Sequence, residues 1–317
     1  MFAYFVRRLG MTALVMFLSS LFLASLVYLV PGDPVKIVLG PRASPELIQR
    51  ARTEMGLDKP ILVQLFEFYS NALRGDLGRD FITRVPVAEL IGQPLLHTVI
   101  LALSSLGVAT LVGVPLGVYS AAHPNTWIDR ATGILSVSFI SLPPFVAGLL
   151  LLLVFAVLLG ILPAVGVGEL SDPLDYIRHL ILPTTALAAL WIGYLGRLVR
   201  ASVLEVLNAN YIRTAFAFGL KERLVFYKYA LKNALVPTVA VLGSSMGSLL
   251  GGAVFIEVIF TRPGLGRLIY DAIATRNYPV VRGGVLVATV LFVLSNLIAD
   301  LFLSYLDPRL QHVEVRQ

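Results

Sequence analysis

The sequence predicts an all-α integral membrane protein with six transmembrane helices, and three observations lead to this fold class. Of the 317 residues, 57% are hydrophobic and only 14% are charged, whereas soluble domains carry about 25% charged residues. Apolar runs of about 20 residues, long enough to cross a bilayer core as helices, recur along the chain. The chain has no cysteine, which excludes disulfides, thiolate metal ligands and cysteine nucleophiles.

Six apolar runs are expected to be spans. They lie near residues 9–30, 95–121, 134–162, 181–200, 237–260 and 283–305. The first follows Arg7 and Arg8, and it is longer than the apolar region of a usual signal peptide, so we interpret it as a retained span. The third contains Pro143 and Pro144, whose rings remove backbone hydrogen bonds. We expect a short leading segment before this dipeptide and the true span after it.

The distribution of basic residues predicts that both termini lie in the cytoplasm. In that orientation the short inner segments carry 12 lysines and arginines, the short outer loops carry 5, and residues 31–94 carry 8. The last group is discounted because the positive-inside rule does not apply to long loops. The expected parts are a cytoplasmic tip and first span (1–30), an extracytoplasmic loop (31–94), a transmembrane core (95–305) and a cytoplasmic tail (306–317).

The outer loop is expected to form a small helical subdomain, with eight basic and eight acidic residues in balance. Ser44 and Pro45 are typical of a helix start, and Gly56 is typical of a helix end. Pro60 opens a second amphipathic stretch. The side chains predicted to share its apolar side are Leu62, Leu65, Phe66 and Tyr69.

The fifth expected span carries a signal for close helix packing. Gly243, Gly247 and Gly251 are spaced by four residues, and small residues at this spacing let another helix backbone approach closely. The partner is either a helix of the same chain or a helix of another subunit, and the pattern does not distinguish them.

A basic segment, residues 203–236, separates the fourth and fifth expected spans. A first helix is expected to run to Phe218, Gly219 to supply the left-handed residue that ends it, and a second helix to begin near Lys221. At helical spacing the second helix has a basic stripe opposite an apolar side. The stripe contains Lys221, Lys228 and Lys232, and the apolar side contains Phe226, Tyr227, Ala230 and Ala234.

Three interpretations of this segment compete. It could lie on anionic lipid, form a solvated inner loop, or dock another protein. Lipid binding and solvation explain basic residues, but neither explains a helix, a glycine corner, a second helix and the exit residue Pro237 in that order.

The segment resembles the cytoplasmic EAA loop of ABC importer permeases, a helix–turn–helix that docks on the ATP-binding subunit. Aligned on Gly219, the EAA triplet falls at residues 213–215. The stretch "YALKNALVP" at 229–237 is similar to the "HALRNALIP" of dipeptide, oligopeptide and nickel permeases, with Tyr229 in place of histidine. The resemblance implies an ATPase-coupling site at Arg213, Thr214, Ala215, Gly219, Leu220, Lys221 and Lys228.

Further motifs extend the resemblance over nearly the whole chain. They are "YFVRRLG", "VPGDP", "GLDKP", "RGDLG", "PVAELI", "TRPGLGRLIYDAI", "RNYPVV" and "LDPRL". The family usually has aspartate where Asn277 stands. The "VPGDP" motif and the long outer loop look like the B-type permease subunit rather than its sister.

The resemblance implies the type I ABC importer permease fold and a subunit that is not catalytic by itself. Its expected partners are a second permease subunit, two ATP-binding subunits that hold ATP and Mg²⁺, an extracytoplasmic binding protein and the lipid of a bacterial or archaeal cytoplasmic membrane. The implied substrate is a peptide or a related small solute. An ion-gradient-driven transporter, which would be expected to show inverted repeats, and a non-transporting scaffold or sensor are the alternatives.

The chain lacks the motifs of several other functions. No P-loop, nucleic-acid module or hydrolase motif occurs, so no bound cofactor is expected. The four histidines, at 97, 123, 179 and 312, lack metal-ligand spacing. Glu257, Asn296 and Asp300 lie near or within spans, where polar groups are costly. They either line a substrate path or play a structural role, pairing with an arginine, a helix end or a neighbouring helix.

Overall fold

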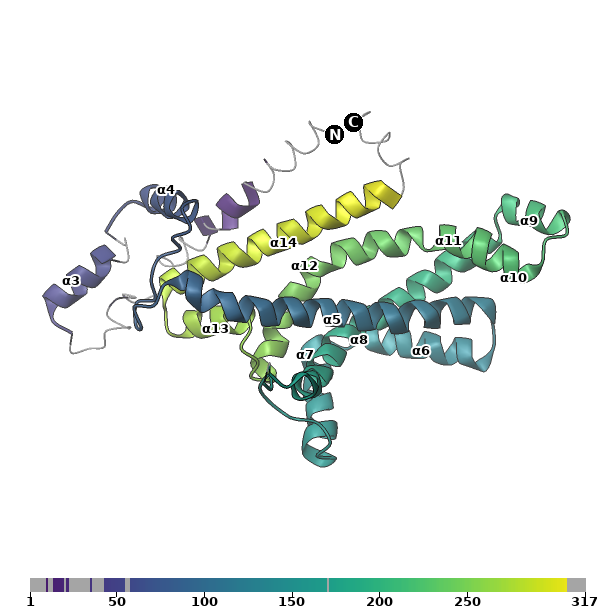
Figure 1. Ribbon diagram of the computed structural model, residues 1–317, viewed down its shortest axis with the longest axis horizontal. Coiled ribbons are helices and arrows are strands. Elements are labelled where there is room, and N and C mark those ends of the chain that lie inside the picture. Colours follow the sequence, from purple (N-terminus) through teal and green to yellow (C-terminus); the bar gives the residue numbers. More distant parts are fainter. Residues whose placement is uncertain are drawn as a thin grey trace. The chain divides into compact units, whose positions relative to one another are not determined.

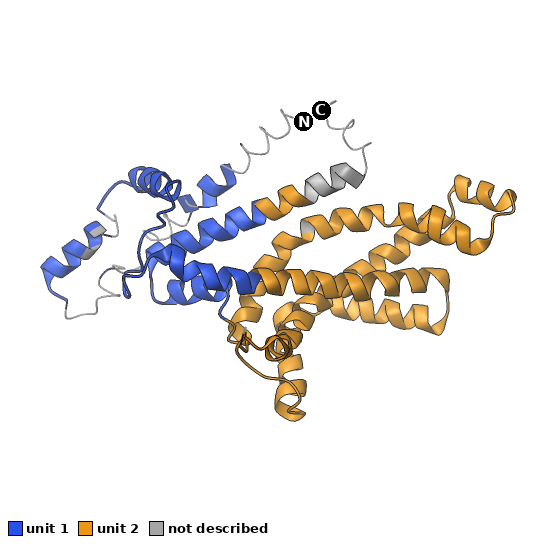
Figure 2. Cartoon of the chain, in the orientation of Figure 1, with its two compact units in different colours: residues 1–98, 263–293 blue, residues 99–262, 294–317 orange. Residues whose placement is uncertain are grey.

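The computed structural model is built of helices, and it describes residues 10, 14–19, 21–22, 35, 43–54, 58–169 and 171–306, with only the backbone at 51, 244 and 299–306. The elements, shown in Figure 1, are α3 (Pro45–Glu54), α4 (Ile61–Ala72), α5 (Val87–Ala122), α6 (Trp127–Ser141), α7 (Pro144–Leu151), η1 (Leu152–Leu158), α8 (Pro173–Leu207), α9 (Asn210–Ala217), α10 (Glu222–Leu224), η2 (Val225–Ala230), α11 (Leu231–Ala234), α12 (Val236–Ile259), α13 (Leu265–Ala274) and α14 (Tyr278–Leu306). Two compact units, residues 1–98 with 263–293 and residues 99–262 with 294–317, each have their own core (Figure 2).

Three helices are long and apolar enough to cross a membrane: α5, α8 and residues Tyr278–Ile298 of α14. Two bent helix pairs meet the same test when each pair is counted as one span, which gives up to five spans among the described residues. The second, fourth and sixth expected spans thus coincide with helices that extend beyond the expected bounds. The total of six remains a prediction, because most of the first expected span, 9–30, lies outside the described residues.

The third expected span breaks at its two prolines, but the pieces differ from the expectation. α6 before the break has 15 residues, while α7 and the π-helix η1 after it have 8 and 7, and the two pieces are bent by 105°. The expectation of a short leading segment followed by a full span was therefore wrong. Pro144 holds Pro143 in an extended conformation (φ −58°, ψ 140°), so the break separates two helical pieces of 15 residues each.

The fifth expected span is α12, and it also bends. The helical path changes direction by 47° between Gly243 and Ser245. Neighbouring glycine and serine residues are a known cause of such kinks, because they pack poorly around the helix and compete for its hydrogen bonds. The first of the three regularly spaced glycines therefore lies at the bend.

In the first unit, the outer segment forms two helices whose starts agree with the sequence. The Ser44 hydroxyl accepts a hydrogen bond from the Leu47 amide at 3.3 Å, which caps α3, and Pro60 precedes α4. The expected stop at Gly56 lies outside the described residues. The predicted apolar side of α4 is confirmed at Leu65, which is buried, and wrong at Leu62 and Phe66, which are 66% and 76% exposed. Leu65 shares the buried side of the helix with Gln64 and Phe68.

The core of the first unit joins the start of α5 to α13 and α14. Its buried members are Val87, Ile91, Leu265, Ala272, Val280 and Val281. The Thr98 hydroxyl accepts a hydrogen bond from the Leu265 amide at 2.8 Å, which satisfies one of the free amides at the start of α13.

In the second unit, glycines bring α5, α6 and α8 into backbone contact. A Cβ on Gly117 of α5 would lie 2.5 Å from the carbonyl oxygen of Gly196 on α8. A Cβ on Gly193 of α8 would lie 2.5 Å from the carbonyl oxygen of Ser136 on α6. Real Cβ atoms essentially never approach oxygen so closely, so both contacts require glycine. These helices therefore pack through the small residues expected of membrane helix pairs.

The glycine contacts generate a test with a matched control. Gly117→Leu should force α5 and α8 apart and cost at least about 1–3 kcal/mol of stability. Gly251→Leu should leave the fold of the chain intact, because a Cβ there meets nothing within 4 Å. The measurement is the thermal unfolding midpoint of each detergent-solubilised variant. Equal midpoints for the two variants would contradict the packing assigned to Gly117.

Candidate coupling site

The predicted coupling segment, residues 203–236, forms a compact helical corner in the second unit. α8 ends at Leu207, α9 follows after Asn208 and Ala209, and a second helical stretch runs from Glu222 to Ala234 as α10, η2 and α11. Figure 1 shows α9, α10 and α11 beyond the end of α8. We name residues 203–236 the coupling unit.

Gly219 makes the corner between the two helical stretches, as the sequence predicts. Its φ is +73°, in the left-handed region. Its amide donates to the carbonyl oxygen of Phe216 at 2.9 Å, and the Leu220 amide donates to that of Ala215 at 3.3 Å. These bonds satisfy carbonyls at the end of α9 that the helix leaves open. A Cβ at Gly219 would meet nothing within 4 Å, so the requirement for glycine comes from the backbone angle and not from space.

A small apolar core holds the corner together. Ile212 and Ala215 of α9 pack against Val225 and Ala230 of η2, and all four are buried. Val225 and Ala230 are five residues apart, which places them on one face only because the intervening segment is a π-helix. The Asn233 side chain adds a polar tie by donating to the Tyr211 hydroxyl at 3.0 Å.

The π-helix changes which side chains face outward. Tyr227, expected on the apolar side, is 64% exposed, so that expectation was wrong. Ala230 and Ala234 are buried as expected. The predicted basic stripe is exposed at Lys221, Lys228 and Lys232. A helix with 3.6 residues per turn was assumed, and the wider turn of the π-helix rotates Tyr227 away from the core.

Most of the predicted coupling residues are exposed, and the others lie beneath them. Arg213, Thr214, Gly219, Lys221 and Lys228 are exposed, Ala215 is buried and Leu220 is half-buried. Sequence reasoning missed the aromatic part of this surface. Its members are Tyr211, Phe216, Phe218 and Tyr227, with exposed fractions from 43% to 81%. The density of aromatic residues in "FAFG" and "VFYKY" is the signal that could have identified them.

Exposed apolar aromatic rings beside cations give the coupling unit the character of a protein-docking surface. Phe218 is 81% exposed at the corner itself, and Arg213 and Lys221 are exposed nearby in the chain. Aromatic and arginine side chains are enriched at the buried centres of protein interfaces. A purely solvated loop would not be expected to hold rings of this size on a rigid corner.

Two of the three possible substrate-path residues have described side chains. Glu257 at the end of α12 is fully buried, and so is Arg262 just beyond it. Burial lowers the pKa of Arg262, while its interactions with Tyr176 and with the Glu257 carboxylate oppose that change. Arg262 donates to the Tyr176 hydroxyl at 2.8 Å. Glu257 thus acts electrostatically on a buried arginine. Asn296 is half-buried on α14, and the side chain of Asp300 lies outside the described residues.

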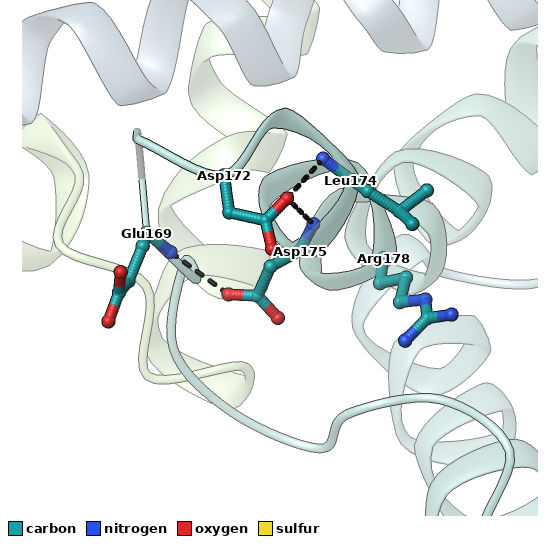
Figure 3. A pocket seen from close by; sticks show the side chains of 5 residues that line it. All are labelled: Glu169, Asp172, Leu174, Asp175 and Arg178. Carbon is teal, nitrogen blue, oxygen red and sulfur yellow. Dashed lines mark hydrogen bonds between the residues drawn. The ribbon is translucent and has the colours of Figure 1, made fainter.

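An acidic pocket lies where α8 begins, with a volume of about 320 Å³. Its lining residues are Glu169, Asp172, Leu174, Asp175 and Arg178 (Figure 3). Asp172 accepts from the amides of Leu174 and Asp175, and Asp175 accepts from the amide of Glu169. These carboxylates cap the helix and order the loop before it. Among the described residues, no three His, Cys, Asp or Glu side chains could hold a metal ion.

In the first unit, Asn277 anchors the loop that carries the "RGDLG" motif. Its side-chain oxygen accepts from the Phe81 amide at 3.5 Å, and its amide group hydrogen-bonds to Asp80. Asp80 also accepts from the amides of Ile82 and Thr83, at 2.6 and 3.0 Å. Burial acts to raise the pKa of Asp80, but these hydrogen bonds outweigh it and hold the pKa below its ordinary value.

The comparisons with known proteins identify the family. Residues 113–312 match the family model described as "Binding-protein-dependent transport system inner membrane component", and residues 1–101 match the model of its N-terminal region. The chain belongs to this family. Its membership makes the protein a permease subunit of an ABC importer, and it overturns the secondary-transporter and scaffold alternatives.

Relatives and solved structures of this permease family agree with the assignment. The chain is 37% identical over 312 residues to the glutathione transport system permease protein GsiC of Escherichia coli O6:H1, with 98% of this chain and 100% of that one covered. It is 38% identical over 333 residues to the dipeptide transport system permease protein DppB of Alkalihalophilus pseudofirmus, with 98% and 100% covered. An inward-facing MetNI methionine ABC transporter matches 69% of this chain and 96% of that chain, with a TM-score of 0.56 and 18% identity, and so shares the fold.

The corner at Gly219 yields a prediction that separates backbone angle from side-chain size. Gly219→Val should distort the turn, because a left-handed residue with a Cβ costs about 1–2 kcal/mol. Gly219→Asn is the matched control, since asparagine tolerates this conformation. We expect the valine variant to insert normally but to co-purify poorly with the ATP-binding subunit, while the asparagine variant co-purifies as the native chain does. Equal co-purification of the two variants would show that the left-handed turn is not needed for docking.

The Asn277 anchor yields a prediction about pH. In the native chain the lowered pKa of Asp80 means that the anchor is present above the ordinary pKa of an aspartate and is lost only as pH falls below it. Asn277→Asp places a second carboxyl beside Asp80, so one of the two must hold a proton to keep the anchor. Uptake by the variant, relative to native, should therefore fall as pH rises from about 5 to 8. The measurement is the pH profile of uptake by reconstituted vesicles. Asn277→Ala should lose uptake equally at each pH, and an Asn277→Asp profile of that flat shape would refute the pairing.

Proposed function

We propose that this permease imports small peptides or closely related solutes. The observation that carries the proposal is its similarity, over 98% of its length, to permeases named for glutathione and dipeptide transport. Glutathione and dipeptides share a peptide bond, a free ammonium group and free carboxylates. The substrate class is therefore a zwitterionic peptide of a few residues.

The coupling unit is the part of the chain that would receive force from ATP hydrolysis. Its corner is held by hydrogen bonds and a buried apolar cluster, and its surface combines exposed aromatic and basic side chains. Its position in the sequence corresponds to the EAA loop of the family. The proposed contact surface contains Arg213, Thr214, Gly219, Lys221 and Lys228, with Ala215 and Leu220 supporting it from below. Phe218 and Tyr227 add the apolar part of the contact.

The proposed assembly contains this chain, a sister permease, two ATP-binding subunits and an extracytoplasmic binding protein. ATP and Mg²⁺ would be held by the ATP-binding subunits. With six spans and cytoplasmic termini, the coupling unit faces the cytoplasm and residues 31–94 face outward. ATP-driven closure of the ATPase pair would displace the coupling unit and shift the spans between inward-facing and outward-facing states. Such coupling requires that the docked surface differ in free energy between the two states.

Two further surfaces have proposed partners. On α12, Gly251 is exposed and a Cβ there would meet nothing within the chain, so the stripe of Gly243, Gly247 and Gly251 is proposed to face the sister permease. On α4, Leu62 and Phe66 are exposed apolar side chains, and this side of the outer helix is proposed to receive the binding protein.

If the glycine stripe of α12 faces the sister permease, Gly251→Leu should fold but fail to co-purify with the sister permease.

Reconstitution of the whole importer tests the function. The binding protein of this importer is purified and titrated with dipeptides, glutathione and a nickel chelate. The ligand that binds is then offered to vesicles that contain the complex. We expect uptake of a peptide that depends on ATP and on the binding protein. Leu62→Ser with Phe66→Ser should raise the concentration of binding protein needed for half-maximal uptake without changing basal ATP hydrolysis. Uptake of a non-peptide ligand alone would reject the substrate class.

A further inference from the structure

In the second unit, the buried carboxylate of Asp129 joins three helices, α5, α6 and α8, close to the coupling unit. Asp129, near the start of α6, is 6% exposed. Arg200 of α8 reaches it through two parallel hydrogen bonds, from Nε to Oδ1 at 2.6 Å and from Nη2 to Oδ2 at 2.8 Å. The Ser120 hydroxyl of α5 donates to Oδ1, and the Asn125 amide donates to Oδ2 at 2.9 Å. Both carboxylate oxygens are therefore fully used.

The coupling unit packs onto the same part of the molecule. Ala121 of α5, Val199 and Val203 of α8, and Ala234 of α11 are buried together in one apolar cluster. Phe226 and Leu231 of the coupling unit's second helical stretch pack against this cluster. Figure 1 shows the turn between α5 and α6 at the same end as α9 and α11. The coupling unit thus shares an apolar cluster with α5 and α8 and does not depend on the chain connection to α8 alone.

The contacts to α6 are of a different kind. The apolar cluster contains residues of α5, α8 and the coupling unit, but its members do not include a residue of α6. Near the middle of α6, Gly193 of α8 lies against the backbone of Ser136. At the end of α6 nearest the coupling unit, the Asp129 ion pair and its hydrogen bonds make the connection.

We propose that Asp129 and Arg200 are positioning residues that make α6 move with the coupling unit when the ATP-binding subunits act on it. The inference rests on the proposed coupling function. It adds that α5, α6, α8 and the coupling unit move as one body, and that the ion pair fixes the start of α6 to this body at the end nearest the coupling unit. A bidentate arginine–carboxylate pair suits this role, because its two bonds fix angle as well as distance. Removing Arg200 would leave the buried Asp129 carboxylate without a compensating charge.

Distance measurements between two attached labels test the single body directly. The chain has no cysteine, so Trp127→Cys at the start of α6, where the side chain is 78% exposed, and Lys232→Cys on α11 introduce unique sites for spin labels. In the complex with otherwise native sequence, the distance distribution should be the same without nucleotide and in the ATP-trapped state. With Arg200→Gln added, the distribution should change between those states. If the distance distribution changes with nucleotide in the chain that keeps Arg200, the proposal is overturned. This outcome does not depend on whether the Arg200→Gln variant folds.

Transport measurements test whether the pair matters for coupling. Asp129→Asn and Arg200→Gln should each lower the substrate transported per ATP hydrolysed by about ten-fold, within the range typical of coupling between sites, while the ATP-binding subunits still co-purify. The double variant should be no worse than either single variant, because the two side chains act as one pair. Arg200→Lys, which keeps the charge but not the two parallel bonds, should fall between native and Arg200→Gln. Arg197→Gln is the matched control, since Arg197 is an exposed arginine one turn earlier on α8.

The outcomes separate this inference from the proposed function. If the complex does not hydrolyse ATP in response to loaded binding protein with the native chain, the proposed function fails. If it does, but Asp129→Asn and Arg200→Gln transport normally per ATP or their effects add independently, the positioning role fails. If Arg197→Gln lowers transport per ATP as much as Arg200→Gln, the effect is one of surface charge and the ion pair is not the cause.

Discussion

Close backbone contact between α5, α6 and α8 is the constraint on which the second unit depends. Helices in lipid gain little from hydrophobic burial against one another, so they associate through van der Waals packing and interhelical hydrogen bonds. Gly117 against Gly196 and Gly193 against Ser136 supply the first of these. The Asp129–Arg200 pair supplies the second at one end. With the three helices held this closely, the coupling unit has a firm surface to pack on.

The coupling unit combines a fixed corner with an unusual helix. Gly219 turns the chain at a left-handed backbone angle, and the π-helix η2 then rotates the following side chains so that Val225 and Ala230 face the core. π-helical turns cost hydrogen-bond geometry and are frequent at functional sites. Here the irregular turn has a visible consequence, because it leaves Tyr227 on the outer surface beside the exposed corner.

The first unit shows a second use of local polar chemistry. A loop that begins with "RGDLG" is tied to residue 277 by a side-chain amide that both donates and accepts. An amide can do this at any pH, whereas a carboxylate in the same position would need a proton to donate. Asn277 therefore adds no titrating group of its own to the anchor, and Asp80 is the member of the pair that titrates.

The sequence by itself determined the features that depend on a few neighbouring residues. The apolar runs predicted α5, α8 and α14, Pro143 predicted the break after α6, Ser44 predicted the start of α3, and Gly219 predicted the corner of the coupling unit. Each follows from a local rule: the length that crosses a bilayer, a missing amide, a capping hydroxyl or a positive φ. The motif order also predicted the permease family, which the comparisons confirmed.

Only the tertiary structure decided which surfaces meet. The sequence drew attention to Gly243, Gly247 and Gly251, yet a Cβ at Gly251 would meet nothing within 4 Å, whereas Gly117 and Gly193 lie against the backbone of a neighbouring helix. Spacing along one helix does not reveal which helix lies opposite. The buried side of α4 and the outward position of Tyr227 were likewise set by neighbours and by a π-turn that a fixed period of 3.6 residues does not foresee. Asp129 and Arg200 are 71 residues apart in the chain. Their pairing arises only when α6 and α8 are packed side by side, since the strength of an ion pair depends on distance in space and on exclusion of water, and neither quantity is encoded in a local pattern.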